Sequence, residues 1–349
     1  MSKRPHLFAA TLATSVCLSA LPAMATEGVV ASIKPVHSLV AAVMEGVGTP
    51  QLLVKGAGSP HTYALRPSEA QALEQARLVF RIGNDLEVFL TRPLETLGSK
   101  ATIVNLSDAH DAVRLDVREG GSFEAHRHDD QDEKHSHDHD HAHEGEHDHD
   151  EGHDHDGHDH GKHDHDHDAH AHHGIDMHMW LDPVNAKAFV HEIEEVLAKI
   201  DPANAAAYGA NAAKLSEKLD ALVIETNAAL ASVRGKTFVV FHDAYQYFEH
   251  RFDFAAAGAI TVNPEVMPGA QRLTEIRDRV KELGAACIFA EPQFEPRLIS
   301  VVAEGTDARS GVLDPLGAEL EDGPELYFDL IRGLTTSLTT CLSGTANNP

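Results

Sequence analysis

Short apolar segments alternate with amphipathic segments in two separate parts of the chain, and this alternation is what most restricts the fold. The first part has predicted strands at 28–33, 51–56, 78–83 and 101–107. The second part has predicted strands at 237–241, 254–260, 287–291 and 310–314. Strands that alternate with helices form parallel sheets covered by helices. We therefore predict an α/β fold with two lobes, each a mainly parallel sheet flanked by helices.

A long helical segment lies between the two parts. Residues 203–233 run mostly without a helix breaker, which predicts a helix of about 30 residues and about 45 Å. Such a helix is long for a globular domain, and we predict that it is rigid and joins the lobes. The predicted organisation is an N-terminal metal-binding lobe at 26–202, the linking helix at 203–233 and a C-terminal metal-binding lobe at 234–349.

The first 25 residues have the features of a secretory signal peptide. Lys3 and Arg4 precede an apolar run that ends near Leu21, and the small residues "AMA" end at Ala25. The run is shorter than the roughly 20 residues that span a bilayer. Cys17 follows Val16 inside the apolar run, which does not fit a lipid-attachment site. We expect cleavage after Ala25 and export of a soluble protein.

The tract 126–173 interrupts the first lobe. It contains nineteen His and seventeen Asp or Glu, and it has no Val, Ile, Leu, Phe, Tyr, Trp or Met. Without apolar surface to bury, such a segment cannot offset the entropy lost on ordering. We therefore predict a disordered loop whose composition favours metal ions.

Charge and cysteine content narrow the class of protein. The net charge of −27 opposes binding to a phosphate backbone, so nucleic acid is not an expected partner, whereas cations are attracted. Removal of the signal peptide leaves Cys287 and Cys341. Two cysteines in an exported chain suggest a disulfide. The alternative is a buried free thiol at Cys287, inside the apolar run "CIFA".

Three histidines outside the tract stand at the edges of predicted elements. His61 follows the second strand, His178 lies where the chain leaves the tract, and His242 follows the strand "TFVVF"; Asp314 follows "SGVL". The carboxyl ends of parallel strands are the usual place for a ligand site. Three imidazoles and one carboxylate suit tetrahedral Zn²⁺. A site shared between lobes would couple binding to a hinge movement.

Five motifs occur in order along nearly all of the mature chain: "SPHTYALRPSE" (59–69), "HMWLDP" (178–183), "FHDAYQYF" (241–248), "AEPQF" (290–294) and "LDPLG" (313–317). With these motifs the chain resembles the cluster A-I metal-binding proteins of bacterial ABC importers, and among them the zinc-specific periplasmic components of the ZnuA type. The resemblance implies two α/β lobes bridged by one long helix. It also implies zinc ligands at His61, His178 and His242, and it supports a disulfide between Cys287 and Cys341.

The fourth ligand varies in this family. A Glu precedes the first histidine in some zinc members, but Pro60 stands there in this chain. In other members, including manganese members, the Asp of "LDPLG" binds the metal, and it is Asp314 here. Asp314 or a water therefore remains, and we favour the carboxylate slightly. Glu291 of "AEPQF" either holds a ligating histidine in its orientation or has a structural role.

The resemblance places the tract on a loop near the cleft, as in zinc rather than manganese members. Neutral imidazole prefers Zn²⁺ over Mn²⁺, so we expect a weak accessory store that passes zinc to the cleft or senses its level. The alternative is a solvating loop with incidental metal affinity. The predicted accessory ligands are His135, His137, His139, His141, His143, His147, His149, His153, His155, His158, His160, His163, His165 and His167.

The sequence thus predicts a monomeric periplasmic protein that binds zinc for the permease of an ABC importer. We expect no enzyme activity, because no general base accompanies the three histidines. The alternatives are a manganese importer of the same family, a zinc buffer and a zinc hydrolase. We expect His37, His110, His191 and His250 to be surface or helix residues rather than ligands.

Overall fold

The structure is a computed structural model that describes residues 26–118, 174–261, 264, 268–295 and 297–344. The predicted signal peptide and the whole histidine tract, with its predicted accessory ligands, lie outside the described residues.

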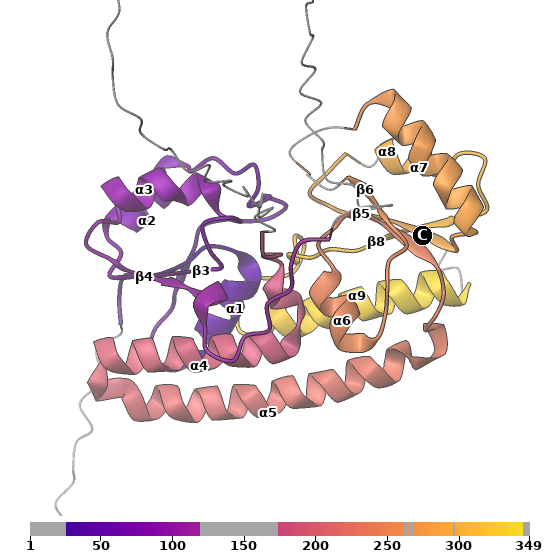
Figure 1. Cartoon of the computed structure of the whole chain (residues 1–349). Helices are drawn as coiled ribbons and strands as arrows, with labels where there is room; N and C mark the ends of the chain where they lie inside the picture. Colours follow the sequence, from indigo (N-terminus) through magenta and orange to yellow (C-terminus); the bar gives the residue numbers. More distant parts are fainter. Residues whose placement is uncertain (1–25, 119–173, 262–263, 265–267, 296, 345–349) are drawn as a thin grey trace, which may run out of the picture.

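The first lobe is built on a parallel sheet of four strands in the order β2-β1-β3-β4 (Figure 1). Every residue of the central strands β1 and β3 is buried, as expected for a parallel sheet covered on both faces. The elements of this lobe are β1 (Val29–Ala31), α1 (Lys34–Val43), β2 (Gln51–Leu52), α2 (Pro67–Glu74), β3 (Leu78–Arg81), η1 (Val88–Leu90), α3 (Thr91–Thr96), β4 (Thr102–Asn105), η2 (Leu106–Asp108), η3 (Met179–Leu181) and α4 (Pro183–Ile200).

The second lobe repeats this plan with the parallel order β6-β5-β7-β8. Its strand β5 is buried throughout. Its elements are β5 (Phe238–His242), α6 (Gln246–Phe252), β6 (Ala259–Thr261), α7 (Ala270–Leu283), β7 (Cys287–Ala290), α8 (Arg297–Ala303), β8 (Arg309–Val312) and α9 (Leu326–Ser343). The predicted fold class of two parallel-sheet lobes is therefore confirmed.

One long helix runs beneath both lobes in Figure 1, as predicted. This helix, α5 (Ala205–Leu230), has 26 residues and is flanked by the short helices η4 (Pro202–Asn204) and η5 (Ala231–Val233). It packs against α4 on the side of the first lobe and against α9 of the second lobe. The two halves of the chain are thus held by the same helix.

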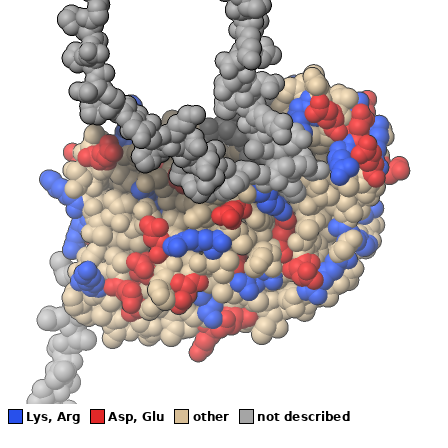
Figure 2. Space-filling model, in the orientation of Figure 1, with Lys and Arg blue, Asp and Glu red and all other residues tan. Residues whose placement is uncertain are grey.

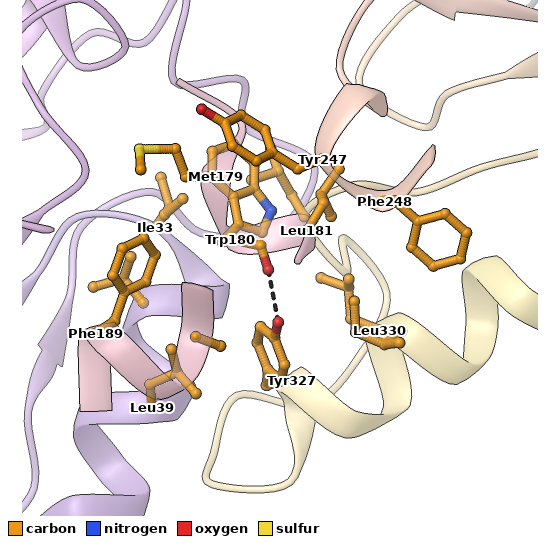
Figure 3. Close-up of a cluster of buried hydrophobic side chains, with 14 of the residues drawn as sticks. Ile33, Leu39, Met179, Trp180, Leu181, Phe189, Tyr247, Phe248, Tyr327 and Leu330 are labelled. Atoms are coloured by element: carbon orange, nitrogen blue, oxygen red, sulfur yellow. Dashed lines mark hydrogen bonds between the residues drawn. The ribbon is translucent and has the colours of Figure 1, made fainter. Parts of the chain in front are cut away.

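The lobes share a buried core rather than meeting at a wet surface. One continuous cluster of buried apolar side chains contains residues of both lobes. At its centre, Tyr327 of α9 donates its hydroxyl to the carbonyl oxygen of Trp180 at 2.7 Å, and the indole of Trp180 donates to the carbonyl oxygen of Pro315 at 2.7 Å (Figure 3). Large apolar interfaces oppose relative domain motion, so this core opposes the hinge movement expected from the sequence.

Acidic and basic side chains are interspersed on the face that Figure 2 shows. Within the described part of the chain, no helix combines the length and the hydrophobicity that crossing a bilayer requires.

The predicted disulfide is present between Cys287 and Cys341, 54 positions apart in the sequence. It joins the first residue of β7 to α9. Glu291 follows the carboxyl end of β7, whereas Cys287 lies at its amino end. The disulfide and Glu291 are therefore at opposite ends of this strand.

Replacing both cysteines by alanine is expected to lower the free energy of unfolding by about 4 kcal/mol, because the disulfide closes a loop of more than fifty residues in the unfolded chain. Metal affinity should change less than threefold, since the disulfide lies at the end of β7 away from the histidines. Urea unfolding of the metal-free protein and a zinc competition assay measure the two effects. A large loss of affinity without a loss of stability would contradict this assignment.

Candidate metal centre

Three histidines from separate parts of the chain meet between the lobes. His61 lies in the loop between β2 and α2, His178 directly precedes η3, and His242 is the last residue of β5. His178 and His242 are buried, whereas His61 is partly exposed. Their positions follow from the fold, because loops beyond the carboxyl ends of parallel strands converge at one edge of a sheet.

The three imidazoles have the spacing of a tetrahedral metal site. The Nε2 atom of His178 lies 3.3 Å from the Nε2 atoms of both His61 and His242. One ligand atom from each of the three residues lies within 4.8 Å of the others. Zn–N bonds of about 2.0–2.1 Å in a tetrahedron separate two nitrogens by about 3.3–3.4 Å. The observed separation therefore fits Zn²⁺.

Two carboxylates determine which nitrogen of each buried ring carries the proton and which presents a lone pair. Asp176 Oδ1 lies 2.8 Å from His178 Nδ1, and Glu291 Oε1 lies 2.7 Å from His242 Nδ1. An ionised carboxylate only accepts hydrogen bonds, so each Nδ1 carries the proton and each Nε2 presents a lone pair. Two lone pairs that face each other at 3.3 Å repel unless a cation or a proton lies between them.

Asp176 is a functional residue that the sequence analysis missed. Its carboxylate also accepts from the backbone N–H of His178 at 3.0 Å, which fixes the turn as well as the ring. The available signal was the spacing in "DMH", where an Asp two residues before a candidate ligand can reach its Nδ1. Glu291 also accepts from the backbone N–H of its own partner, His242, at 3.2 Å.

The electrostatic environment differs between the rings. Burial, with the neighbouring His178 and His242 next in size, lowers the pKa of His61 to about 2, so this ring stays neutral. Burial also disfavours the charged form of His242, but the carboxylate of Glu291 outweighs it and raises the pKa of this ring above its usual value. A proton on His242 must therefore leave before the ring can bind a metal.

A small cavity of about 10 Å³ adjoins the three rings. This is about the space that the centre of one water molecule occupies. The cavity has mostly apolar walls beside the histidines. Its lining residues are Pro60, His61, His178, Trp180, His242, Glu291, Gln293, Phe294, Pro315 and Leu316.

The structure does not bring Asp314, the predicted fourth ligand, into the group of three histidines. Its Oδ1 accepts from the backbone N–H groups of Leu316 and Gly317 at 3.1 and 2.9 Å, and its Oδ2 accepts from that of Ala318 at 2.5 Å. The side-chain amide of Gln293 donates to Oδ1 at 2.9 Å. Asp314 thus stabilises the turn whose residues Pro315 and Leu316 form a wall of the cavity.

The remaining histidines of the described chain lie elsewhere. His110, His191 and His250 are exposed. His37 lies in α1 and is buried, with its Nε2 3.2 Å from the carbonyl oxygen of Pro50. Within the described residues, no second group of three or more His, Cys, Asp or Glu has metal-binding spacing.

Comparison with known proteins shows the family of this chain and agrees with its fold. A sequence profile described as "ZnuA: Zinc-uptake complex component A periplasmic" matches residues 29–341. A Brucella suis protein named "High-affinity zinc uptake system protein ZnuA" is 56% identical over 91% of this chain and 92% of its own length. Proteins of the same name from Paracoccus denitrificans and Yersinia pestis are 44% and 37% identical, over 95% and 98% of this chain and 97% and 99% of their own lengths.

Solved structures share the architecture. One described as "Crystal structure of ZnuA" has a TM-score of 0.68 at 21% identity, over 92% of this chain and 99% of that chain. The Mn²⁺ complex of the Pseudomonas aeruginosa protein FpvC has a TM-score of 0.68 at 15% identity, over 91% of this chain and 99% of that chain. At these identities the structures show the fold alone.

The family profile spans most of the chain, and relatives well above 30% identity extend over more than nine-tenths of it. The resemblance predicted from the five sequence motifs is therefore confirmed, and the chain belongs to the ZnuA family of periplasmic zinc-uptake components.

Proposed function

We propose that this protein captures Zn²⁺ in the periplasm and delivers it to the membrane permease of an ABC importer. The observation that carries the proposal is the meeting of three imidazoles, in which the Nε2 atom of His178 lies 3.3 Å from those of both His61 and His242 and two of the rings are oriented by carboxylates. This arrangement brings three imidazole nitrogens together at separations that suit Zn²⁺ once any proton on His242 has been released. The names of the relatives, which are 37–56% identical, support the same role.

In this proposal His61, His178 and His242 bind the ion, and a water completes the tetrahedron. We now favour water over Asp314, because a move of Asp314 to the metal would leave three backbone N–H groups without their acceptor. Each unsatisfied buried group costs about 1–3 kcal/mol. The carboxylates of Asp176 and Glu291 supply two negative charges beside the rings, which balance the charge of Zn²⁺ in a mostly buried site.

The partly exposed ring of His61 gives the proposed site its entrance. Its low pKa keeps this ring uncharged at any pH of the periplasm, and its partial exposure lets it meet an arriving ion before the buried rings do. The tract 126–173 has the proposed role of a weak accessory store for Zn²⁺, on the strength of its histidine content alone.

Replacing any one of His61, His178 or His242 by alanine is expected to weaken zinc binding at least a hundredfold, because each ring supplies one of three protein ligands. The matched control is His191→Ala, on the exposed face of α4, which should change affinity less than twofold. Competition with a chromophoric chelator at substoichiometric zinc measures the tight site.

The same variants test the transport role. In a strain that lacks the protein, His242→Ala should fail to restore growth in chelator-treated medium, whereas His191→Ala should restore it. If the strain grows without any copy of the protein, a buffering role would replace uptake.

Zinc affinity is expected to fall as pH decreases through the pKa of His242, which lies above the usual 6.5. The sign follows from competition: protons bound to the metal-free ring must be released on metal binding, so affinity is complete above this pKa and decreases below it. Competition titrations between pH 5.5 and 8.0 measure the slope. An affinity independent of pH would exclude histidine ligation.

Deletion of residues 126–173 should leave one tight zinc site and remove the weaker ones, because all three proposed ligands lie outside the tract. Calorimetric titration of the full and shortened chains compares the stoichiometries. Competition between Zn²⁺ and Mn²⁺ on the shortened chain should favour Zn²⁺, since imidazole is a poorer ligand for Mn²⁺. Loss of the tight site with the tract would show that the ligands are misplaced.

A further inference from the structure

Gln293 is a polar residue in the wall of the metal cavity that the three-histidine site does not use. It lies beyond the carboxyl end of β7, two residues after Glu291. Its side-chain Nε2 donates to Asp314 Oδ1 at 2.9 Å. Since a carboxylate oxygen cannot donate, the nitrogen of the amide must face Asp314. The carbonyl oxygen of Gln293 is therefore held on the opposite side of the amide.

That oxygen has no partner among the described residues. Gln293 Oε1 is buried and accepts no hydrogen bond, and the same is true of Glu291 Oε2. Buried acceptors without a donor are uncommon and cost about 1–3 kcal/mol each. Both residues line the cavity beside the three imidazoles. Apart from the histidines, they supply the only ionisable or amide side chains in the wall of this cavity.

A metal-bound water would satisfy these acceptors. Such a water gives one lone pair to Zn²⁺ and keeps two O–H groups as donors, and two residues of the cavity wall have an acceptor oxygen without a donor. The cavity of about 10 Å³ has room for one such molecule. The alternative ligand, Asp314, already accepts four hydrogen bonds and would lose them on moving to the metal.

We propose that Gln293 is a positioning residue that accepts a hydrogen bond from the water on Zn²⁺, and that Asp314 acts on the metal through Gln293 rather than as a ligand. This inference rests on the proposed function of the three-histidine site. It assigns the fourth coordination position to a neutral ligand held by a neutral amide, so the negative charge in contact with the rings comes from Asp176 and Glu291.

The test is Gln293→Met, which keeps the length of the side chain and removes its amide. Zinc affinity should fall about tenfold, in the range found for groups that orient metal ligands. The visible absorption bands of the Co²⁺-loaded full-length protein should shift, because the hydrogen bonding of the fourth ligand changes. The melting temperature of the metal-free protein should stay within a degree or two, since Gln293 is only partly buried.

The matched control is Gln246→Met on α6. Gln246 also has a buried Oε1 without a partner and an Nε2 that donates, in this case to the carbonyl oxygen of Asp116 at 3.1 Å, but it does not line the cavity. Its affinity and Co²⁺ spectrum should match the unmodified protein. The inference is wrong if the zinc affinity of Gln293→Met stays within twofold of that of the unmodified protein. It is also wrong if this affinity is reduced no more than that of Gln246→Met.

A double-mutant cycle separates the two roles of Asp314. If Asp314 acts through Gln293, the combination of Asp314→Asn with Gln293→Met should weaken binding no more than the stronger single change. If Asp314 is the ligand, Asp314→Asn alone should cost far more than Gln293→Met, and the effects should add. His61→Ala, run in parallel, tests the underlying site: if it keeps tight binding, the proposed function fails, whatever Gln293 does.

Discussion

The structure depends on the short segment at residues 176–182, in which every second side chain makes a buried contact. Asp176 orients His178, Trp180 bonds to the second lobe, and Asp182 caps α4 while it accepts two hydrogen bonds of 2.7 Å from Arg251. These contacts fix a proposed metal ligand, a residue of the shared core and the start of a helix in one run of backbone. The positions of the two lobes and the geometry of the site therefore have a common origin.

A site with this origin is organised before the ion arrives. The rings of His178 and His242 already present their lone pairs, and the lobes on either side are joined by a continuous apolar core and by α5. Affinity then comes from avoided rearrangement more than from closure around the ion. Facing lone pairs and buried acceptor oxygens without donors are locally unfavourable, and in the proposed function a bound ion with its water relieves both. Strain of this kind belongs at functional sites.

Much of the fold could be read from the sequence, because strand and helix patterns are local and the parallel pairing follows from their alternation. Strand lengths were less accurate. The apolar run at 51–56 contains only the two residues of β2 as a regular strand, although Leu53 and Val54 still donate to the carbonyl oxygens of Ala31 and Ser32 at 3.0 and 2.9 Å. The disulfide followed from the count of cysteines and the predicted export.

The site was predictable only in part. The three histidines were visible as polar residues at the ends of strands. Asp176 and Gln293 were not, because their roles depend on which hydrogen bonds are satisfied in three dimensions. Asp314 illustrates the same limit: the motif identifies an important carboxylate, but only the structure reveals that its oxygens accept backbone N–H groups. The shared core was not predictable for a similar reason, since periodicity gives no measure of how much apolar surface two lobes share.

The two ends of the histidine tract enter and leave the folded protein at one place. Asp116 and Ile175 form an antiparallel bridge, Val117 donates to the carbonyl oxygen of Gly174 at 2.9 Å, and Arg118 pairs with Asp243 and Glu249 of the second lobe. Both points at which the insertion is attached are therefore fixed by contacts within the described residues. Doubling such a loop costs only about 0.6 kcal/mol in closure entropy. A change in the length or sequence of this insertion is therefore expected to leave the proposed ligand His178 in its place.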